Sequence, residues 1–167
     1  MFSIAWFLFA AILLAATVTD VAAYRIPNMF VLALVVLFFV LAALHAPDVD
    51  WLSHVASLCL VFGAGIVVYA LRQIGAGDVK LLAAIALWSG VYSLMDVLFW
   101  VSICGLMGML MILALRALLP RLAIVAPGLR SQSLPRVFSK GQGIPYGIAI
   151  GSGAILASFH FPEWLWL

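Results

Sequence analysis

Long apolar runs separated by short polar breaks constrain this chain more than any other feature of its sequence. Of its 167 residues, 68% are hydrophobic and 8% are charged, whereas soluble domains carry about 25% charged residues. The chain therefore has too few polar side chains to cover its own apolar surface, which excludes a soluble globular fold. We expect a single small membrane domain over residues 1–167.

The apolar runs have the length and character of membrane-spanning helices. A helix needs about 20 mostly apolar residues to cross the hydrocarbon layer, and the runs lack the alternation that marks membrane β-strands. The breaks predict an all-α fold of about six transmembrane helices, near residues 2–19, 29–44, 51–71, 79–92, 97–119 and 144–167. Pro, Gly and Ser predict a loop from Pro120 to Gly143.

The charges are segregated along the chain in a way that predicts a membrane orientation. All eight Lys and Arg residues lie in the first, third and fifth connections between the predicted helices, and cytoplasmic loops are enriched in these residues. The other connections and the C-terminal tail carry acids without bases, so we expect them outside, together with both termini. On that side we expect interfacial residues at His45, His54 and His160. Near the ends of the spans, Trp51, Trp100, Trp164 and Trp166 fit an aromatic belt.

Asp20 and Asp78 are the two acids on the predicted cytoplasmic side. Asp20 ends the first predicted helix, where a carboxylate opposes the helix dipole. Asp78 precedes the fourth predicted helix by one residue, and it has two interpretations: a helix N-cap, or a functional group paired with Asp20. Ionisable residues at membrane depth are functional candidates, and these two would meet if the first and fourth helices pack together.

Three segments of the chain resemble the type IV prepilin peptidases. Asp20 to Asn28 is similar to their Asp-plus-Ile-Pro-Asn segment, and Gly75-Ala76-Gly77-Asp78 to their Gly-x-Gly-Asp signature. Ile144-Pro145-Tyr146-Gly147-Ile148-Ala149 is similar to the Pro-aromatic-Gly start of the family's last helix. The resemblance implies an aspartic endopeptidase of the bacterial inner membrane, which removes the leader of prepilins or pseudopilins at the cytoplasmic face.

The matching positions carry distinct expected roles. Asp20 and Asp78 match the catalytic pair, and Gly75 and Gly77 match the signature glycines. Without Cβ atoms these glycines would let an extended substrate approach, or they form a flexible turn. Pro145 and Tyr146 are candidates for the substrate cleft, or alternatively they begin a helix. Gly147 and Gly151 have a Gly-x-x-x-Gly spacing that permits close helix packing.

The expected chemistry needs two carboxylates and neither metal nor cofactor. Two close aspartates share a proton, so one acts as a base on water while its protonated partner polarises the scissile carbonyl. The predicted cytoplasmic side offers no His or Cys ligand for a catalytic zinc. Prepilin and membrane lipid are the expected partners, and nothing in the sequence indicates nucleic-acid binding.

The chain also differs from the larger members of the family. It lacks their N-terminal extension with Cys-x-x-Cys motifs, so the resemblance favours the compact peptidases of Flp/Tad pilus systems, without methyl transfer. The main alternative is an ion- or proton-coupled transporter that uses the two aspartates. A third possibility, a noncatalytic assembly subunit, would use both aspartates in caps or packing.

Overall fold

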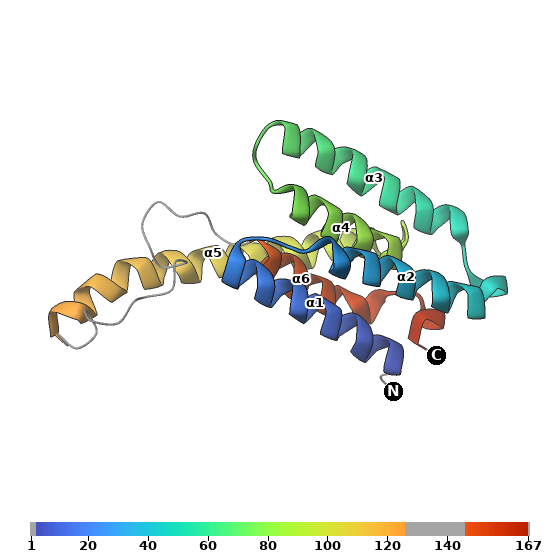
Figure 1. The fold of residues 1–167 in the computed structure, drawn as a ribbon, viewed down its shortest axis with the longest axis horizontal. Helices are drawn as coiled ribbons and strands as arrows, with labels where there is room; N and C mark the ends of the chain where they lie inside the picture. The colour runs from blue at the N-terminus through green and yellow to red at the C-terminus, as the bar shows by residue number, and fades with distance from the viewer. Residues whose placement is uncertain (1–2, 126–145, 167) are drawn as a thin grey trace.

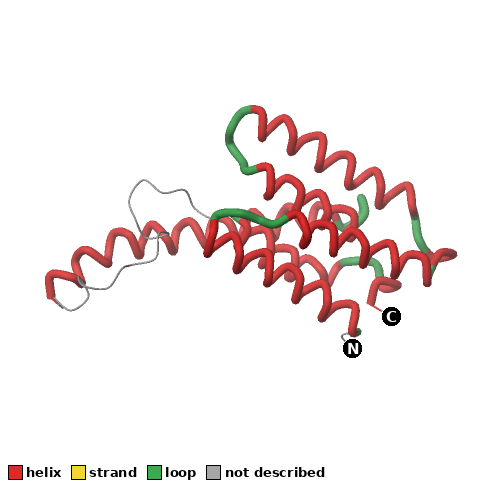
Figure 2. The backbone as a smooth tube through the Cα atoms, in the orientation of Figure 1, coloured by secondary structure: helices red, strands yellow, loops and turns green. Residues whose placement is uncertain are grey.

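The fold is entirely helical within the residues that the computed structural model describes, 3–125 and 146–166 (Figures 1 and 2). The predicted all-α class is therefore confirmed. The helices Ile4–Ala23, Trp51–Ala70 and, within a longer helix, Leu94–Leu118 are long and apolar enough to cross a membrane, which indicates a membrane protein. The α-helices are α1 (Ile4–Ala23), α2 (Asn28–Leu44), α3 (Trp51–Ala70), α4 (Ala76–Ser89), α5 (Leu94–Val125) and α6 (Gly147–Ala157).

Residues at the helix ends explain where α1 stops and α2 starts. α1 continues four residues beyond its predicted end at residue 19 and stops at Tyr24, which has a left-handed backbone (φ +52°). The Tyr24 N–H donates to the Asp20 carbonyl at 2.8 Å. Pro27 then has the extended backbone of an N-cap (φ −61°, ψ 136°), because its ring restricts the chain before a helix. Asp20 thus lies inside the last turn of α1.

Two glycines set the bounds of α4, which differ from the predicted range 79–92. Gly75 has an extended backbone (φ −75°, ψ 147°) and is the N-cap, so the helix begins at Ala76. Gly90 has a φ of +63°, which favours glycine and ends the helix after Ser89. The interpretation of Asp78 as the N-cap is therefore wrong, because Asp78 is the third residue of the helix.

α5 continues past Pro120, where a loop was predicted. A proline inside a helix removes one backbone donor, and apolar membrane helices tolerate this loss. The loop prediction is wrong for residues 120–125, which are helical, and its remainder lies outside the described residues. Figure 1 shows the second half of α5 running beyond the ends of the other helices.

The core joins two sets of packed helices. α6 packs against α5 and α1, and α4 packs against α3 and α2 (Figure 1). Aromatic rings fill the space between them, with Phe9 and Trp88 centroids 4.6 Å apart. Trp164 and His54 were expected at the membrane interface, but they are 7% and 2% exposed and belong to the interior.

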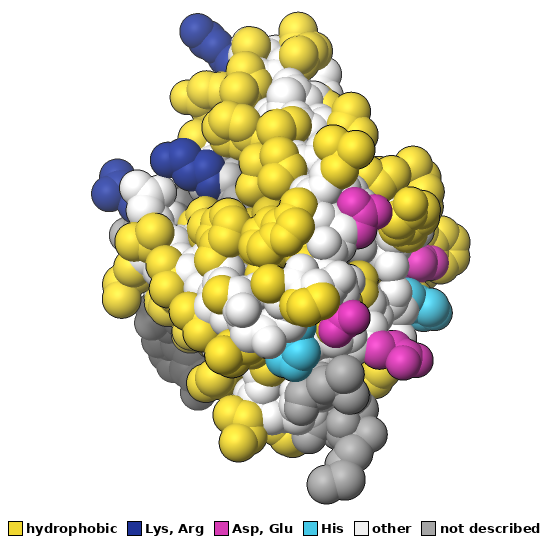
Figure 3. Space-filling model, turned by 90° about the vertical axis from the view of Figure 1, so that its right-hand side faces the viewer, with side chains coloured by type: hydrophobic (Ala, Val, Ile, Leu, Met, Phe, Trp, Pro, Cys, Tyr) yellow, Lys and Arg dark blue, Asp and Glu magenta, His cyan; other side chains and the backbone are white. Residues whose placement is uncertain are grey.

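The acidic side chains other than Asp20 and Asp78 gather at one end of the bundle. Figure 3 looks onto the end that lies at the right of Figure 1, where the acidic and histidine side chains collect and Lys and Arg lie at the margin. The short 3-10 helices Ala46–Asp48 and Glu163–Trp166 place Asp48 and Glu163 there. Among the described residues, these acids are thus at the opposite end from the basic residues Arg25, Arg72 and Lys80, and the membrane orientation stays a prediction.

Candidate active site

Asp20 and Asp78 lie at the end of the bundle opposite the chain termini (Figure 1). Asp20 comes from the last turn of α1 and Asp78 from the first turn of α4, while α6 begins beside them at Gly147. The charge of Asp20 acts on the Asp78 carboxyl. The structure therefore places the two predicted carboxylates at the same end of the bundle.

Asp20 is buried and accepts a hydrogen bond from the start of another helix. It is 6% exposed, and its Oδ2 accepts the Gly147 N–H at 2.8 Å. The first amides of a helix have no acceptor within that helix, and they carry the positive end of its dipole. α6 thus supplies at Gly147 the compensation that α1 cannot provide to a carboxylate at its own C-terminal end.

The Asp78 side chain reaches back towards Gly75, the N-cap of its helix. Its carboxylate accepts the Gly75 N–H, in the arrangement of a capping box, where the third helical residue reaches back to the N-cap. Burial, followed by the charge of Asp20, raises the pKa of the Asp78 carboxyl to about 6, while the Gly75 N–H lowers it. The pair therefore retains a proton at mildly acid pH.

The two signature glycines stand in crowded positions. A Cβ on Gly75 would lie 3.0 Å from Oδ2 of Asp78, and a Cβ on Gly77 would lie 3.3 Å from Cβ of Ile26. Gly75 thus leaves room for the carboxylate, and Gly77 lets α4 approach the connection between α1 and α2. The substrate approach expected at these glycines stays a prediction, to which the structure adds a packing reason for each.

A hydrogen bond on the surface joins the starts of α2 and α4 next to the aspartates. The Lys80 Nζ donates to Oδ1 of Asn28 at 3.2 Å. This bond connects the Ile-Pro-Asn segment to the helix that carries Asp78. Two of the three segments that the sequence analysis singled out are therefore in direct contact.

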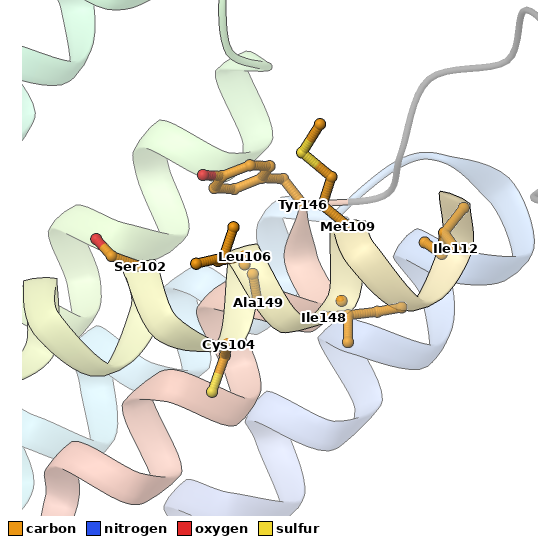
Figure 4. Close-up of a pocket in the computed structure, with 10 residues that line it drawn as sticks. Ser102, Cys104, Leu106, Met109, Ile112, Tyr146, Ile148 and Ala149 are labelled. Atoms are coloured by element: carbon orange, nitrogen blue, oxygen red, sulfur yellow. The ribbon is translucent and has the colours of Figure 1, made fainter. Parts of the chain in front are cut away.

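Tyr146 connects two cavities near the aspartates. A cavity of about 310 Å³ is bounded by Val68, Gln73, Ile74, Gly75, Asp78 and Tyr146. A second cavity of about 320 Å³ lies along α5 and α6, and Tyr146 lines it together with Leu106, Met109 and Ala149 (Figure 4). Pro145, the other residue expected at the substrate cleft, lies outside the described residues.

The role of Gly147 at the site was not predicted from the sequence. Its Gly-x-x-x-Gly spacing suggested packing alone, yet its amide is the donor to Asp20. Its position directly after Pro145 and Tyr146 was the available signal. The contact itself joins residues that are 127 positions apart, which no local pattern reveals.

Within the described residues, no three His, Cys, Asp or Glu side chains group in a way that could hold a metal ion. Asp20 and Asp78 offer two carboxyl groups beside a cavity. One carboxylate can take a proton while the other gives one. The metal-free mechanism stays a prediction.

Comparison with known protein families gives a match that includes Asp20, Asp78, Gly75 and Gly77. The model of the type IV leader peptidase family matches residues 7–110, which is more than half of the chain and includes both aspartates and the glycine signature. Comparisons with curated proteins and with solved structures give no match.

Proposed function

The chain belongs to the type IV leader peptidase family, and on this premise we propose that it is an aspartic endopeptidase with Asp20 and Asp78 as its catalytic pair. The single observation that carries the proposal is that the last turn of α1 and the first turn of α4 place these two carboxyl groups at the same end of the bundle. A peptidase needs a base and an acid within reach of one peptide bond. Two carboxyl groups that share a proton provide both.

The proposed reaction uses the singly protonated pair. The ionised carboxylate removes a proton from a water molecule, whose oxygen attacks the scissile carbonyl carbon. The protonated carboxyl donates to the carbonyl oxygen. As the C–N bond breaks, the departing amine takes up the proton that the other carboxylate removed from water, and the first carboxyl regains its proton from the collapsing intermediate. Because the two groups interact, their titration belongs to the pair rather than to either residue.

The proposed substrate is a prepilin or pseudopilin that inserts beside the pair. The cavity at Asp78 suits the backbone around the scissile bond, and Tyr146 stands between it and the cavity along α5 and α6. That second cavity is lined mostly by apolar residues (Figure 4), which favours an apolar segment of the substrate. Pro145 and Tyr146 are proposed to line this cleft.

The charge distribution supports a membrane placement for the site. Arg25, Arg72 and Lys80 belong to the same end of the bundle as the aspartates, and basic loops remain in the cytoplasm. We place the protein in the bacterial inner membrane as a multi-pass protein with its site near the cytoplasmic face. A compact form that serves an Flp/Tad-like pilus is the proposed assignment within the family.

Incubating the purified protein with a panel of prepilins in lipid vesicles tests the proposal. Cleavage is measured as a loss of mass equal to the leader peptide. The expected result is one cut in a prepilin and none in a variant of that prepilin with an altered leader junction. If no prepilin is cut and the vesicles instead take up protons or cations, the protein is a transporter.

A further inference from the structure

We propose that Thr17 and Gly147 are positioning residues that orient the Asp20 carboxylate for catalysis. The inference deepens the proposed function and rests on it, since it takes Asp20 as a catalytic group. Neither residue needs to touch the substrate for this role. Both act through the contact between α1 and α6.

A hydrogen bond joins the backbone of Gly147 to the side chain of Asp20. The Gly147 N–H donates to Oδ2 at 2.8 Å in a buried setting. Gly147 is the first residue of α6, so its amide has no carbonyl partner within the helix. A buried bond between an amide and a carboxylate is short and directional. It fixes one of the two carboxylate oxygens.

The position of Gly147 leaves no space for a side chain. A Cβ there would lie 2.7 Å from Oδ2, 2.9 Å from Cβ and 3.0 Å from Cγ of Asp20. Any side chain at this position would displace the carboxylate or move the start of α6. Glycine therefore permits an approach of the backbone to Asp20 that no other residue allows.

Thr17 lies one turn before Asp20 on the same face of α1. Its hydroxyl donates to the Leu13 carbonyl at 2.8 Å and reaches the Gly147 carbonyl at 3.3 Å. One residue of α6 thus meets Asp20 through its N–H and Thr17 through its C=O. The hydroxyl joins the two helices at the peptide unit next to the one that holds Asp20.

The contact between α1 and α6 also sets the register of the two helices. A Cβ on Gly151, one turn along α6, would collide with Oγ1 of Thr17. Asp20 thus faces Gly147 while Thr17 faces Gly151, so two successive turns of α1 interlock with two successive turns of α6. Sliding α6 along α1 would break both contacts, and the Gly147 amide would lose its aim at Asp20.

Substitutions at Thr17 separate positioning from packing. Thr17→Val keeps the branched shape and removes the hydroxyl, and Thr17→Ser keeps the hydroxyl and removes a methyl group. We expect Thr17→Val to lower kcat by up to about 100-fold, since small misplacements of a catalytic group cost that much, with little change in KM. Thr17→Ser should restore most of kcat. The matched control is Thr19→Val, because among the described residues the Thr19 hydroxyl bonds to Ala16 of its own helix.

Gly147→Ala should lower kcat at least as much as Thr17→Val. Gly63→Ala is its control, because a Cβ on Gly63 would meet no atom of the described residues within 4 Å. Should Gly147→Ala fail to fold, the Thr17 series decides by itself. Wild-type kcat in a folded Thr17→Val variant would overturn the proposal, as would equal losses in the Thr17→Ser and Thr17→Val variants.

A second measurement is independent of cleavage. Dicyclohexylcarbodiimide modifies accessible carboxyl groups in membranes, and mass spectrometry reports the labelled fraction of Asp20. We expect several-fold more labelling of Asp20 in Thr17→Val than in the wild type, Thr17→Ser or Thr19→Val. Equal labelling in all four would overturn the positioning role even if the enzyme cleaves. If the wild type cleaves no prepilin, the proposed function fails, and the labelling still decides whether Thr17 holds Asp20.

Discussion

The Nδ1 of His54 lies 2.7 Å from the carbonyl oxygen of Leu87, which joins α3 to α4 inside the core. The same ring packs against Phe38, with centroids 5.0 Å apart, and edge-on against Trp164. His54 is therefore a structural residue between helices, far from the end that carries the aspartates.

His54→Ala should destabilise the protein without altering the catalytic step. The substitution leaves the Leu87 carbonyl unpaired and opens a cavity among the aromatic rings, at a combined cost of about 2–4 kcal/mol. Thermal unfolding in detergent measures the loss. His45→Ala is the matched control, because His45 bonds to Leu41 of its own helix and is half-buried. An equal, small effect of both substitutions would contradict the interior role of His54.

Asp20→Asn and Asp78→Asn should each lower kcat by about 10²–10⁴-fold, the contribution of a positioned acid or base. Each amide keeps the size of the side chain and an oxygen that can accept the Gly147 or Gly75 N–H, so both variants should stay folded. Cleavage rates and circular dichroism measure the two effects. Asp48→Asn, at an exposed acid near the other end of the bundle, is the control. A normal rate in either site variant would remove that aspartate from the mechanism.

Activity should decline as the pH rises above about 6. The raised pKa of Asp78, about 6, means that its carboxyl loses the proton there while the charge of Asp20 persists. With both groups ionised, no acid remains to polarise the scissile carbonyl. Rates measured from pH 4 to 9 give the profile. A rate that stays constant from pH 5 to 9 would argue against a shared proton.

The same pKa implies a pH dependence of stability. The folded protein binds a proton at Asp78 up to about pH 6, whereas the unfolded chain releases it near the ordinary value of 3.8. Between these values the folded state holds more protons, so stability falls as pH rises from about 4 to about 6. Melting temperatures measured across this window should decline in the wild type and change less in Asp78→Asn. Parallel curves for the two proteins would contradict the assignment.

Chelators should leave cleavage unchanged, because the proposed chemistry uses only carboxyl groups and water. Two carboxylates and water molecules could bind Mg²⁺, so the experiment discriminates between mechanisms. Rates are compared before and after treatment with EDTA, and again after a divalent ion is added back. Loss and recovery of activity would require a metal-assisted mechanism in which both aspartates act as ligands.

Single cysteines introduced at Asn28 and Asp48 should react from opposite sides of the membrane. The positive-inside pattern places Asn28 in the cytoplasm and Asp48 outside. An impermeant thiol reagent is applied to intact cells in a background where Cys59 and Cys104 are replaced. Labelling at position 28 without labelling at position 48 would reverse the proposed orientation.

Much of the fold follows from local properties of the chain. Apolar runs long enough to span a membrane predict helices, because every backbone group must be paired inside lipid. The ranges near 29–44 and 51–71 closely match α2 and α3. The sequence also predicts that Asp20 and Asp78 lie at one end of the bundle. They adjoin the first and third connections, and helices that alternate in direction return every second connection to the same end.

The atomic arrangement of the site depends on contacts between distant parts of the chain. The Gly147 N–H reaches Asp20 across 127 residues, and only the packing of α6 on α1 selects that pair. His54 resembled an interfacial residue because its sequence neighbourhood is apolar and lies near a polar break, yet three helices and the C-terminal turn enclose it. The apolar pattern of a segment determines whether it forms a helix, and its charges determine on which side of the membrane its ends lie. The hydrogen-bond donor to a carboxylate depends instead on which two helices pack together and in which register.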